Sequence, residues 1–459
     1  MKNRIDISLC CFCLAIALAT ISCNKQDTFL DKKSNAALAV PTTLADFTLL
    51  LNNETIFNAY VSPALGTLSA DDLYVTDATF NVAAEPVDQN AYIFAKDIYQ
   101  GTTVYFEWSS PYQQVYYSNV VLDGLARLKV AQAQSAAYNT IKGEALFFRA
   151  YAFYMLVQTF AMPYEPSASA TDPGIPLVVS SDINKHYSRG TVQAVYNQII
   201  SDLNLATGLL PANLSSVTKP CQLSCNAFLA RLYLSIGKYD QAYTYANKVL
   251  SQDSVLVDYN TITPGSYSLV SKPLPEDIYH TSLINYVLAG DAQIDSNLYK
   301  TYDQDDLRLT YFFRPASSGT GLYFRGSYDS NNDYSGIATD EIYLIRAECS
   351  ARAGNLQPAL NDLNTLLKNR YITGQFIPLK LANQDALLRR ILLEREKELF
   401  FRGLRWTDLR RLNKEAEFMK TVTHVINGVT YTLLPNDKRY ALPIPDQEIQ
   451  LTGIPQNVR

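Results

Sequence analysis

Two acidic residues with helical spacing, Glu394 and Glu398, have the clearest catalytic potential in the chain. They are four residues apart, so a helix would place both carboxylates on one face. Glycoside hydrolases use such a carboxylate pair, but one of the two carboxyl groups must stay protonated. Five arginines lie in the same segment, 394–412, and would hold both acids ionised. We therefore expect a structural arginine–carboxylate lattice, with Glu398 also paired to Arg402 one turn on, and no catalytic residue.

Tyrosines accompanied by amides and carboxylates indicate a different chemistry, the binding of sugars. A sugar ring has apolar C–H faces and a hydroxyl rim, so it fits an aromatic side chain flanked by hydrogen-bonding groups. The chain contains 32 tyrosines, and two segments, 61–107 and 255–338, combine them with Asn and Asp. Trp108 and Trp406 lie in motifs that helix packing explains, so we leave them out of the site. The candidate ligand-binding residues are Tyr74, Asp72, Asn81, Tyr267, Tyr279, Tyr323, Tyr328 and Asn332.

The composition argues against several other functions. A formal net charge of -5 and the lack of a basic block give no electrostatic footprint for nucleic acid. The sequence also contains no H-E-x-x-H or G-x-S-x-G motif and no glycine-rich phosphate-binding motif. We therefore expect a protein that is not an enzyme and that has no cofactor.

Cysteine and aspartate spacing predicts no metal site. Beyond the N-terminal segment the cysteines are Cys221, Cys225 and Cys349, and the three histidines lie far from them in the sequence. Zinc binding is therefore not expected. Cys221 and Cys225 would either form a disulfide or stay as free core residues, and we favour free thiols. The stretch 303–306, D-Q-D-D, lacks the spaced ligands and glycine of a calcium loop, so we expect a solvated acidic turn.

The N-terminus has the pattern of a bacterial lipoprotein signal. Two basic residues precede an apolar run, 7–19, that is too short to span a bilayer as a helix. Small residues follow, and then Cys23 and the polar stretch N-K-Q-D. We interpret 1–22 as a signal peptide and Cys23 as a lipidated residue that begins a tether, 23–40. The alternative is an ordinary cleaved signal peptide with an incidental cysteine nearby.

Apolar residues recur at intervals of three and four over much of the remaining chain, which predicts helices. Residues 108–160 indicate two facing helices, and 191–209 indicate another. Residues 226–250 and 340–367 each have the order of small and apolar residues that is typical of a tetratricopeptide helix pair. A glycine lies at the expected turn of both pairs. We expect a mostly α fold, a scaffold of about four such pairs.

Two long stretches, 61–107 and 255–338, have few helical stripes and interrupt this scaffold. Long ordered loops in a globular protein are usually functional, which is why we seek the ligand there. The expected domain is 41–459, a single unit. Its helical repeats would occupy about 41–60, 108–250 and 339–420.

Several segments, in this order, resemble the SusD/RagB family of outer-membrane lipoproteins of Bacteroidetes. One residue departs from the family pattern: Arg402 stands before Gly403, where the family usually has an acidic residue. The segments are C-N-K-Q-D-T-F-L-D-K-K in the tether (23–33), W-S-S-P-Y-Q-Q-V-Y-Y-S-N (108–119), K-G-E-A-L-F-F-R-A-Y-A-F-Y-M-L-V-Q-T-F-A-M-P-Y (142–164), E-R-E-K-E-L-F-F-R-G-L-R-W-T-D-L-R-R-L (394–412) and L-P-I-P-D-Q-E-I (442–449).

This resemblance implies a SusD-like fold, a tetratricopeptide-like scaffold with loop-rich insertions. It also implies a lipoprotein of the cell outer membrane that faces outward. Such a protein binds an oligosaccharide or polysaccharide and delivers it to a partner TonB-dependent, SusC-like transporter without catalysis. The alternative is a structural or capping partner of a transporter for peptides or another nutrient, with no glycan site of its own.

Overall fold

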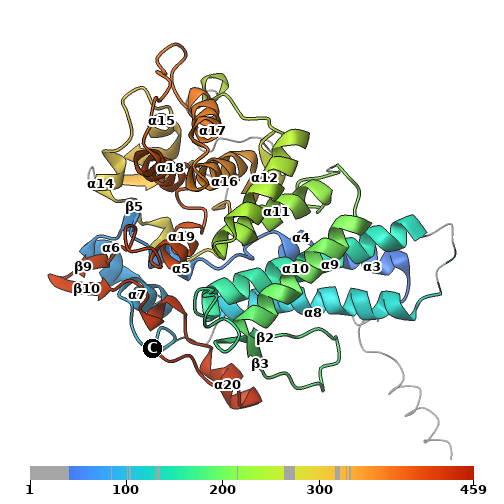
Figure 1. Ribbon diagram of the computed structural model, residues 1–459. Helices are drawn as coiled ribbons and strands as arrows, with labels where there is room; N and C mark the ends of the chain where they lie inside the picture. Colours follow the sequence, from blue (N-terminus) through green and yellow to red (C-terminus); the bar gives the residue numbers. More distant parts are fainter. Residues whose placement is uncertain are drawn as a thin grey trace, which may run out of the picture.

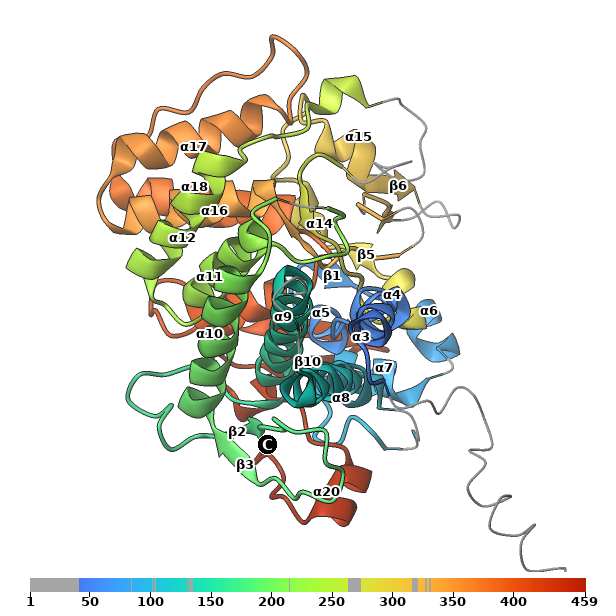
Figure 2. The same cartoon turned by 90° about the vertical axis from the view of Figure 1, so that its right-hand side faces the viewer.

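The computed structural model describes residues 41–459 apart from short gaps, and helices predominate in them. Cys23 and the tether therefore lie outside the described residues, as does Tyr267. Figures 1 and 2 show the helices grouped into one scaffold, with short strands at its edges. The gaps are residues 84, 101, 103–104, 130, 132–134, 214, 263–273, 316–320, 327 and 330–331.

The long helices α8 (Phe106–Arg127) and α9 (Ser135–Phe160) pack against each other and begin the scaffold. The second half of α9 is buried on nearly all sides, as its largely apolar sequence requires, and its one arginine, Arg149, pairs with Asp202 of α10. Helix α3 (Leu44–Leu51) packs on this pair. The close approach depends on Gly124, because a Cβ there would lie 2.3 Å from the ring of Phe47. The sequence thus forms the predicted pair of facing helices.

The next helices extend the scaffold in chain order: α10 (Val192–Leu209), α11 (Gln222–Ser235) and α12 (Tyr239–Gln252). Helix α10 packs on both α9 and α11. Gly237 closes the turn between α11 and α12 with a φ of 71°, a left-handed conformation that glycine adopts without strain. Ala242 and Ala246 are fully buried, and their small side chains allow the two helices to pack closely.

A second group of helices repeats this plan: α16 (Thr339–Arg352), α17 (Leu356–Lys368), α18 (Gln384–Glu398) and α19 (Arg405–Leu412). Gly354, with a φ of 78°, closes the turn between α16 and α17. Helix α16 also packs on α12 and α18, which joins the two groups. The predicted tetratricopeptide-like fold is confirmed.

The two predicted insertions fold together and contain more regular structure than we expected. They share an antiparallel sheet with the strand order β1 (Leu73–Tyr74), β5 (Gln293–Ile294), β7 (Leu322–Phe324) and β6 (Phe313–Pro315). The short strands and one-turn helices have too few residues for a periodic pattern, so the sequence showed only loops. The insertion helices are α5 (Leu65–Leu68), α6 (Asp77–Val82), α7 (Pro86–Tyr92), α13 (Val287–Gly290), α14 (Ser296–Tyr299) and α15 (Arg308–Phe312).

The remaining elements are short and edge the scaffold. Strand pairs link neighbouring segments, and α20 lies near the C-terminus (Figure 1). These elements are α4 (Glu54–Phe57), β2 (Pro173–Pro176) with β3 (Arg189–Thr191), β4 (Asp277–Tyr279) with β8 (Ile337–Ala338), β9 (Val422–Ile426) with β10 (Val429–Leu433), the 3-10 turns η3 (Tyr259–Thr261) and η4 (Lys438–Tyr440), and α20 (Asp446–Thr452).

Candidate functional site

Two of the predicted ligand residues, Tyr74 and Tyr323, meet on the sheet that the insertions share. Tyr74 of β1 lies opposite Gln293 of β5, and Gln293 lies opposite Tyr323 of β7. Tyr323 in turn lies opposite Arg314 of β6. Directly opposed residues of neighbouring strands are on the same face of a sheet. The four side chains therefore form one line across the sheet, which we call the tyrosine row.

The other face of the sheet belongs to the core. Side chains alternate along a strand, so the neighbours of the row residues point the opposite way. These neighbours are apolar and buried: Leu73, Ile294, Phe313 and Phe324. Phe324 packs on Phe400 and Phe401 behind the sheet, at centroid distances of 5.3 and 5.6 Å. This packing fixes the face on which the tyrosine row lies.

Hydrogen bonding and sterics hold the row in place. The Tyr74 hydroxyl donates to Oε1 of Gln293. Gly321 lies directly beside this bond, because a Cβ there would come within 1.4 Å of the same oxygen and 2.8 Å of the Tyr74 hydroxyl. The φ of Gly321 is 82°, so glycine is required for both conformation and space. Any larger residue at 321 would break the row.

The row presents the chemistry that a neutral sugar needs. Tyr74 and Tyr323 are both partly exposed, whereas Gln293 between them is buried. Burial raises the pKa of Tyr74, so its phenol stays neutral near pH 7. The guanidinium of Arg325 lies 5.5 Å from the centroid of the Tyr323 ring. The two partly exposed rings, with guanidinium groups at one end, can stack on a sugar, and the Tyr74 hydroxyl can accept a hydrogen bond from one of its hydroxyls, while Gln293 holds Tyr74 in place.

Tyr279 and Tyr328 are core residues, which corrects our prediction that they bind ligand. Tyr279 is fully buried, with its ring edge-on to Phe147 at 4.8 Å. Tyr328 is 1% exposed, and its hydroxyl donates to Glu276 and Asp340. Both rings are enclosed by the core, so a sugar cannot stack on either.

The predicted polar residues do not join the tyrosine row either. Asp72 precedes β1 but is 2% exposed, so its carboxyl cannot reach a ligand on the surface. Asn81 exchanges hydrogen bonds with Asn427, in the turn between β9 and β10. Asn332 donates to Asp329 in a separate loop.

Sequence reasoning missed Gln293 and Arg314. Nothing near either residue resembles a motif, and both enter the row only through strand register. The strands that carry them, β5 and β6, have two and three residues, which are too few to assign a strand from the sequence.

Glu394 and Glu398 belong to a buried ion lattice, as predicted, but their cationic partners are not the five arginines of 394–412 that we expected. The partners are Arg308, Arg370, Arg390 and Lys397. Arg308 donates to Glu394 at 2.7 Å and to Glu398 at 2.9 Å, and Arg370 donates to Glu398 at 2.7 Å. Burial alone would raise the pKa of Glu394, but Arg308 and Lys397 outweigh it and lower the pKa to about 2. A carboxyl group with that pKa does not serve as a general acid at neutral pH.

Two details of this lattice correct the sequence prediction. Arg402 pairs with Asp340 at 2.8 Å and not with Glu398, because α18 ends at Glu398 and Phe401 takes a positive φ of 61°. Asp306 is 1% exposed and bound to Arg308, so the 303–306 stretch is not a fully solvated turn.

The described part of the chain holds no cluster of side chains that would bind a metal ion. Cys221, Cys225 and Cys349 are buried free thiols, which confirms the choice of free cysteines over a disulfide. Over the same residues, no helix is both long and apolar enough to cross a bilayer.

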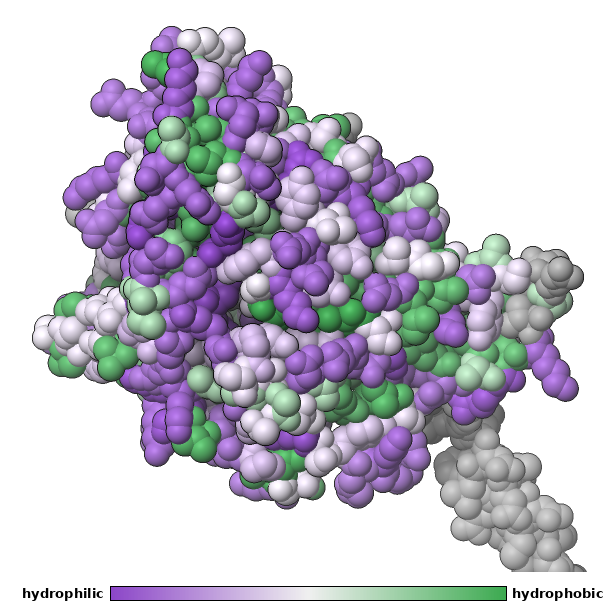
Figure 3. Space-filling model, viewed as in Figure 1, coloured by the Kyte–Doolittle hydropathy of each residue, from purple (hydrophilic) through white to green (hydrophobic). Residues whose placement is uncertain are grey.

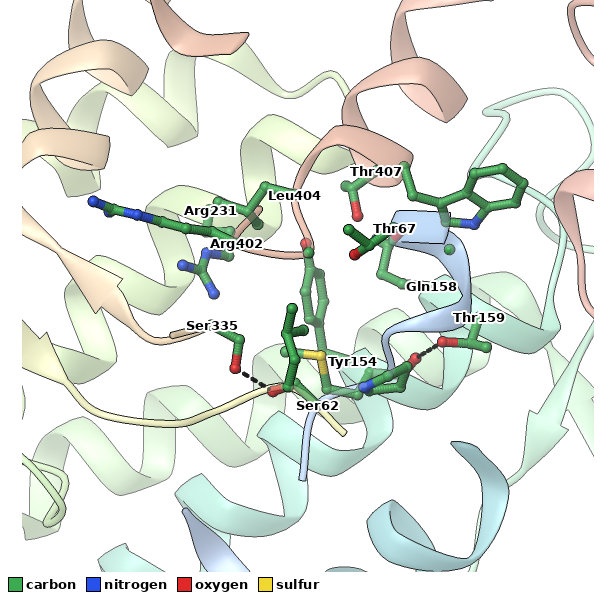
Figure 4. Close-up of a pocket in the computed structure, with 16 residues that line it drawn as sticks. Ser62, Thr67, Tyr154, Gln158, Thr159, Arg231, Ser335, Arg402, Leu404 and Thr407 are labelled. Carbon is green, nitrogen blue, oxygen red and sulfur yellow. Dashed lines mark hydrogen bonds between the residues drawn. The ribbon is translucent and has the colours of Figure 1, made fainter. Parts of the chain in front are cut away.

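An enclosed cavity of about 40 Å³ lies where α9, the insertions and the C-terminal segment meet (Figure 4). Thr67 Oγ1, Arg231 Nη1 and Trp406 Nε1 on its lining are buried and have no hydrogen-bond partner among the described residues. A water needs about 10 to 15 Å³ of such space, so the cavity has room for water and none for a sugar ring. The three polar atoms would suit a bound water, and the Trp406 ring packs on Tyr440 at a centroid distance of 4.7 Å.

The geometry defines a tetratricopeptide-like protein whose insertions present an aromatic and amide surface. Two family models match consecutive parts of the chain: one described as "Starch-binding associating with outer membrane" over residues 28–234, and one described as "SusD family" over residues 284–458. This chain belongs to the SusD/RagB family.

Individual relatives are distant in sequence. The chain is 24% identical over 379 residues to SusD-like protein P2 of Formosa agariphila, an alignment that covers 68% of this chain and 72% of the relative. A SusD superfamily protein from Bacteroides thetaiotaomicron superposes with a TM-score of 0.73 at 21% identity, covering 91% of this chain and all (100%) of that one.

Two further solved structures share the fold. A SusD-like carbohydrate binding protein from Bacteroides vulgatus matches with a TM-score of 0.67 at 20% identity, over 90% of this chain and 97% of that one. A laminarin binding SusD-like protein matches with a TM-score of 0.64 at 20% identity, over 90% of this chain and 98% of that one.

Proposed function

We propose that this protein is a cell-surface lipoprotein that binds an oligosaccharide or polysaccharide and delivers it, without catalysis, to a TonB-dependent, SusC-like outer-membrane transporter. The tyrosine row carries the proposal, because two aromatic rings and an amide converge there from segments far apart in sequence. The carbohydrate binding and laminarin binding SusD-like proteins that share the fold support the same ligand class.

The proposal assigns a task to each part of the chain. Residues 1–22 are the signal peptide, and Cys23 carries the lipid that anchors the protein in the outer membrane, facing outward. Residues 23–40 form the tether, and 41–459 form one domain. A lipid anchor holds a protein at a membrane without a spanning helix, because each buried CH₂ contributes about 0.8 kcal/mol.

Ligand capture at the row would be non-catalytic and reversible. The row is a surface on a sheet, so it covers one side of a sugar and leaves the other side free for a transporter. Binding of this kind depends on stacking and hydroxyl contacts, and truncating one aromatic ring should weaken it about tenfold, or about 1.4 kcal/mol.

Affinity electrophoresis tests this function. The protein without residues 1–22 is run through native gels that contain single polysaccharides, including laminarin and soluble starch. We expect at least one polysaccharide to retard the wild type, and Tyr323→Ala to lose most of that retardation. Tyr243→Ala is the matched control, because Tyr243 is 39% exposed on α12, away from the row. A wild type that no polysaccharide retards would favour a capping protein without a glycan site.

A further inference from the structure

An aromatic groove lies on the helical scaffold, apart from the tyrosine row. It encloses about 670 Å³ between α8, the segment after β2 and α20. Four aromatic side chains of α8 line the groove: Phe106, Trp108, Tyr112 and Tyr116. Gln113 and Glu448 add polar groups to the lining. Figures 1 and 2 both place α20 at the lower end of the molecule, below the sheet that carries the row. The groove and the row are built from different elements.

The floor of the groove is rigid. Trp108 contacts Tyr112 at a centroid distance of 4.7 Å and Phe160 of α9 edge-on at 4.9 Å. The Tyr112 hydroxyl donates to the carbonyl oxygen of Pro176 at 2.9 Å. These contacts hold both rings in place before any ligand arrives, which reduces the entropy lost on binding.

Two large rings stand exposed at the ends of this floor. Phe106 is 52% exposed and Tyr116 is 43% exposed, whereas Trp108 between them is 6% exposed. Phe106 and Tyr116 are ten residues apart on α8, so their backbones are about 15 Å apart along the helix. The spacing leaves room for several linked rings of an extended ligand between them.

The polar groups of the groove indicate a sugar and not a purely apolar ligand. The carboxyl group of Glu448 lines the groove together with Trp108, and burial raises the pKa of Glu448. Gln113 is exposed on the rim and offers an amide donor and acceptor. Hydroxyl groups are both donors and acceptors, so they can satisfy a carboxyl and an amide beside aromatic faces. Figure 3 shows hydrophobic and hydrophilic side chains mixed on the face of the molecule seen in this view.

We propose that this groove is a second glycan-binding site, which takes uncharged sugar rings of the same polysaccharide as the tyrosine row. The proposal rests on the proposed function for its ligand class. Two sites on one chain would bind a long polysaccharide more tightly than either site alone, because the second contact is intramolecular. A short oligosaccharide cannot span both sites and would fill them independently.

Titration calorimetry with short oligosaccharides of the retarding polysaccharide counts the sites. We expect two oligosaccharides per wild-type chain, and one for the double variant Phe106→Ala/Tyr116→Ala. The same variant should bind the full polysaccharide at least fivefold more weakly. Both rings are exposed, so the variant should keep the wild-type melting temperature, and Tyr243→Ala again serves as the control.

The outcomes separate the two proposals. One oligosaccharide per wild-type chain, with the double variant unchanged, would overturn the groove site and leave the tyrosine row intact. If the number of oligosaccharides bound per chain falls in the double variant but not in Tyr323→Ala, the groove is a glycan site and the tyrosine row is not. A double variant that binds sugar normally but loses affinity for the purified transporter would show that the groove contacts a protein, which also overturns the proposal.

Discussion

Arg308 donates a hydrogen bond to Glu394 at 2.7 Å in a site where neither side chain is exposed to solvent. The same guanidinium also donates to Asp306 and Glu398, so one cation contacts three buried carboxylates. Removing one partner of a buried ion pair leaves the others uncompensated. Arg308 is therefore the residue whose removal should affect most of the buried carboxylates around Glu394.

Arg308→Met should lower the free energy of unfolding by about 3 to 5 kcal/mol. Urea denaturation followed by circular dichroism measures the change. The control is Arg389→Met, which removes an ion pair with Asp385 whose side chains are 49% and 54% exposed. Exposed pairs contribute about 0 to 1 kcal/mol, so equal losses in the two variants would contradict the lattice.

Gly321→Ala should abolish glycan binding at the tyrosine row, because the new Cβ would displace Gln293 from Tyr74. Gly374→Ala is a closely matched control: Gly374 has the same φ of 82°, but a Cβ added there would meet no atom of the described residues within 4 Å. Both variants carry the same backbone strain, and only Gly321→Ala should lose retardation in affinity gels. Equal binding by the two variants would show that the row does not hold the sugar.

His280 should contribute a pH-dependent part of the stability. Burial lowers its pKa, but hydrogen bonds to Asp277 and Asp329 outweigh burial and raise the pKa to about 9. The folded state therefore holds the proton more tightly than the unfolded state, whose histidine has a pKa of about 6.5. The contribution is complete below about pH 6.5 and is lost as the pH rises through about 9.

Thermal melts of the wild type and His280→Gln from pH 6 to 10 test this contribution. The gap in melting temperature between the two proteins should be largest at pH 6 and should close toward pH 10. A gap that is constant across this range would contradict the raised pKa. Taking the difference in melting temperature between the two proteins at each pH cancels the titration of groups that behave alike in both.

Asp72 is a buried acid that should also make the stability depend on pH. Burial, and then the neighbouring Asp71, raises the pKa of Asp72 to about 8, so the carboxyl group stays protonated at neutral pH. Between about pH 4 and 8 the folded state keeps a proton that the unfolded state releases, so rising pH removes stability from the wild type. Asp72→Asn lacks this loss, so its stability relative to the wild type should increase from pH 5 to pH 9. A constant difference in unfolding free energy would refute the assignment.

The sequence predicted the scaffold well because its helices are long. Ranges such as 226–250 and 340–367 contain enough turns for apolar spacing and glycine turns to be recognised. The structure begins and ends the corresponding helices within a few residues of those positions. The burial of Glu394 and Glu398 among cations was also predicted, but the central cation Arg308 is 86 residues from Glu394, so the sequence did not identify it.

The site was only partly predictable, because strand register assembles it. Tyr74 and Tyr323 were proposed as tyrosines of polar insertions, and so were Tyr279 and Tyr328, although the latter two are buried. The neighbouring sequence does not distinguish the two partly exposed tyrosines from the two buried ones. They differ in which face of a short strand or loop packs on the core. Gln293 was missed for the same reason. The groove residues Phe106 and Tyr116 were not proposed for ligand binding, since exposure on a helix also depends on its neighbours.

A crystal structure of the protein with an oligosaccharide of the retarding polysaccharide would decide whether the tyrosine row holds the sugar. We expect a sugar ring stacked on Tyr74 or Tyr323, with a sugar hydroxyl group hydrogen-bonded to the hydroxyl of Tyr74. An oligosaccharide bound elsewhere on the domain, with the tyrosine row bare at saturating ligand, would contradict this assignment.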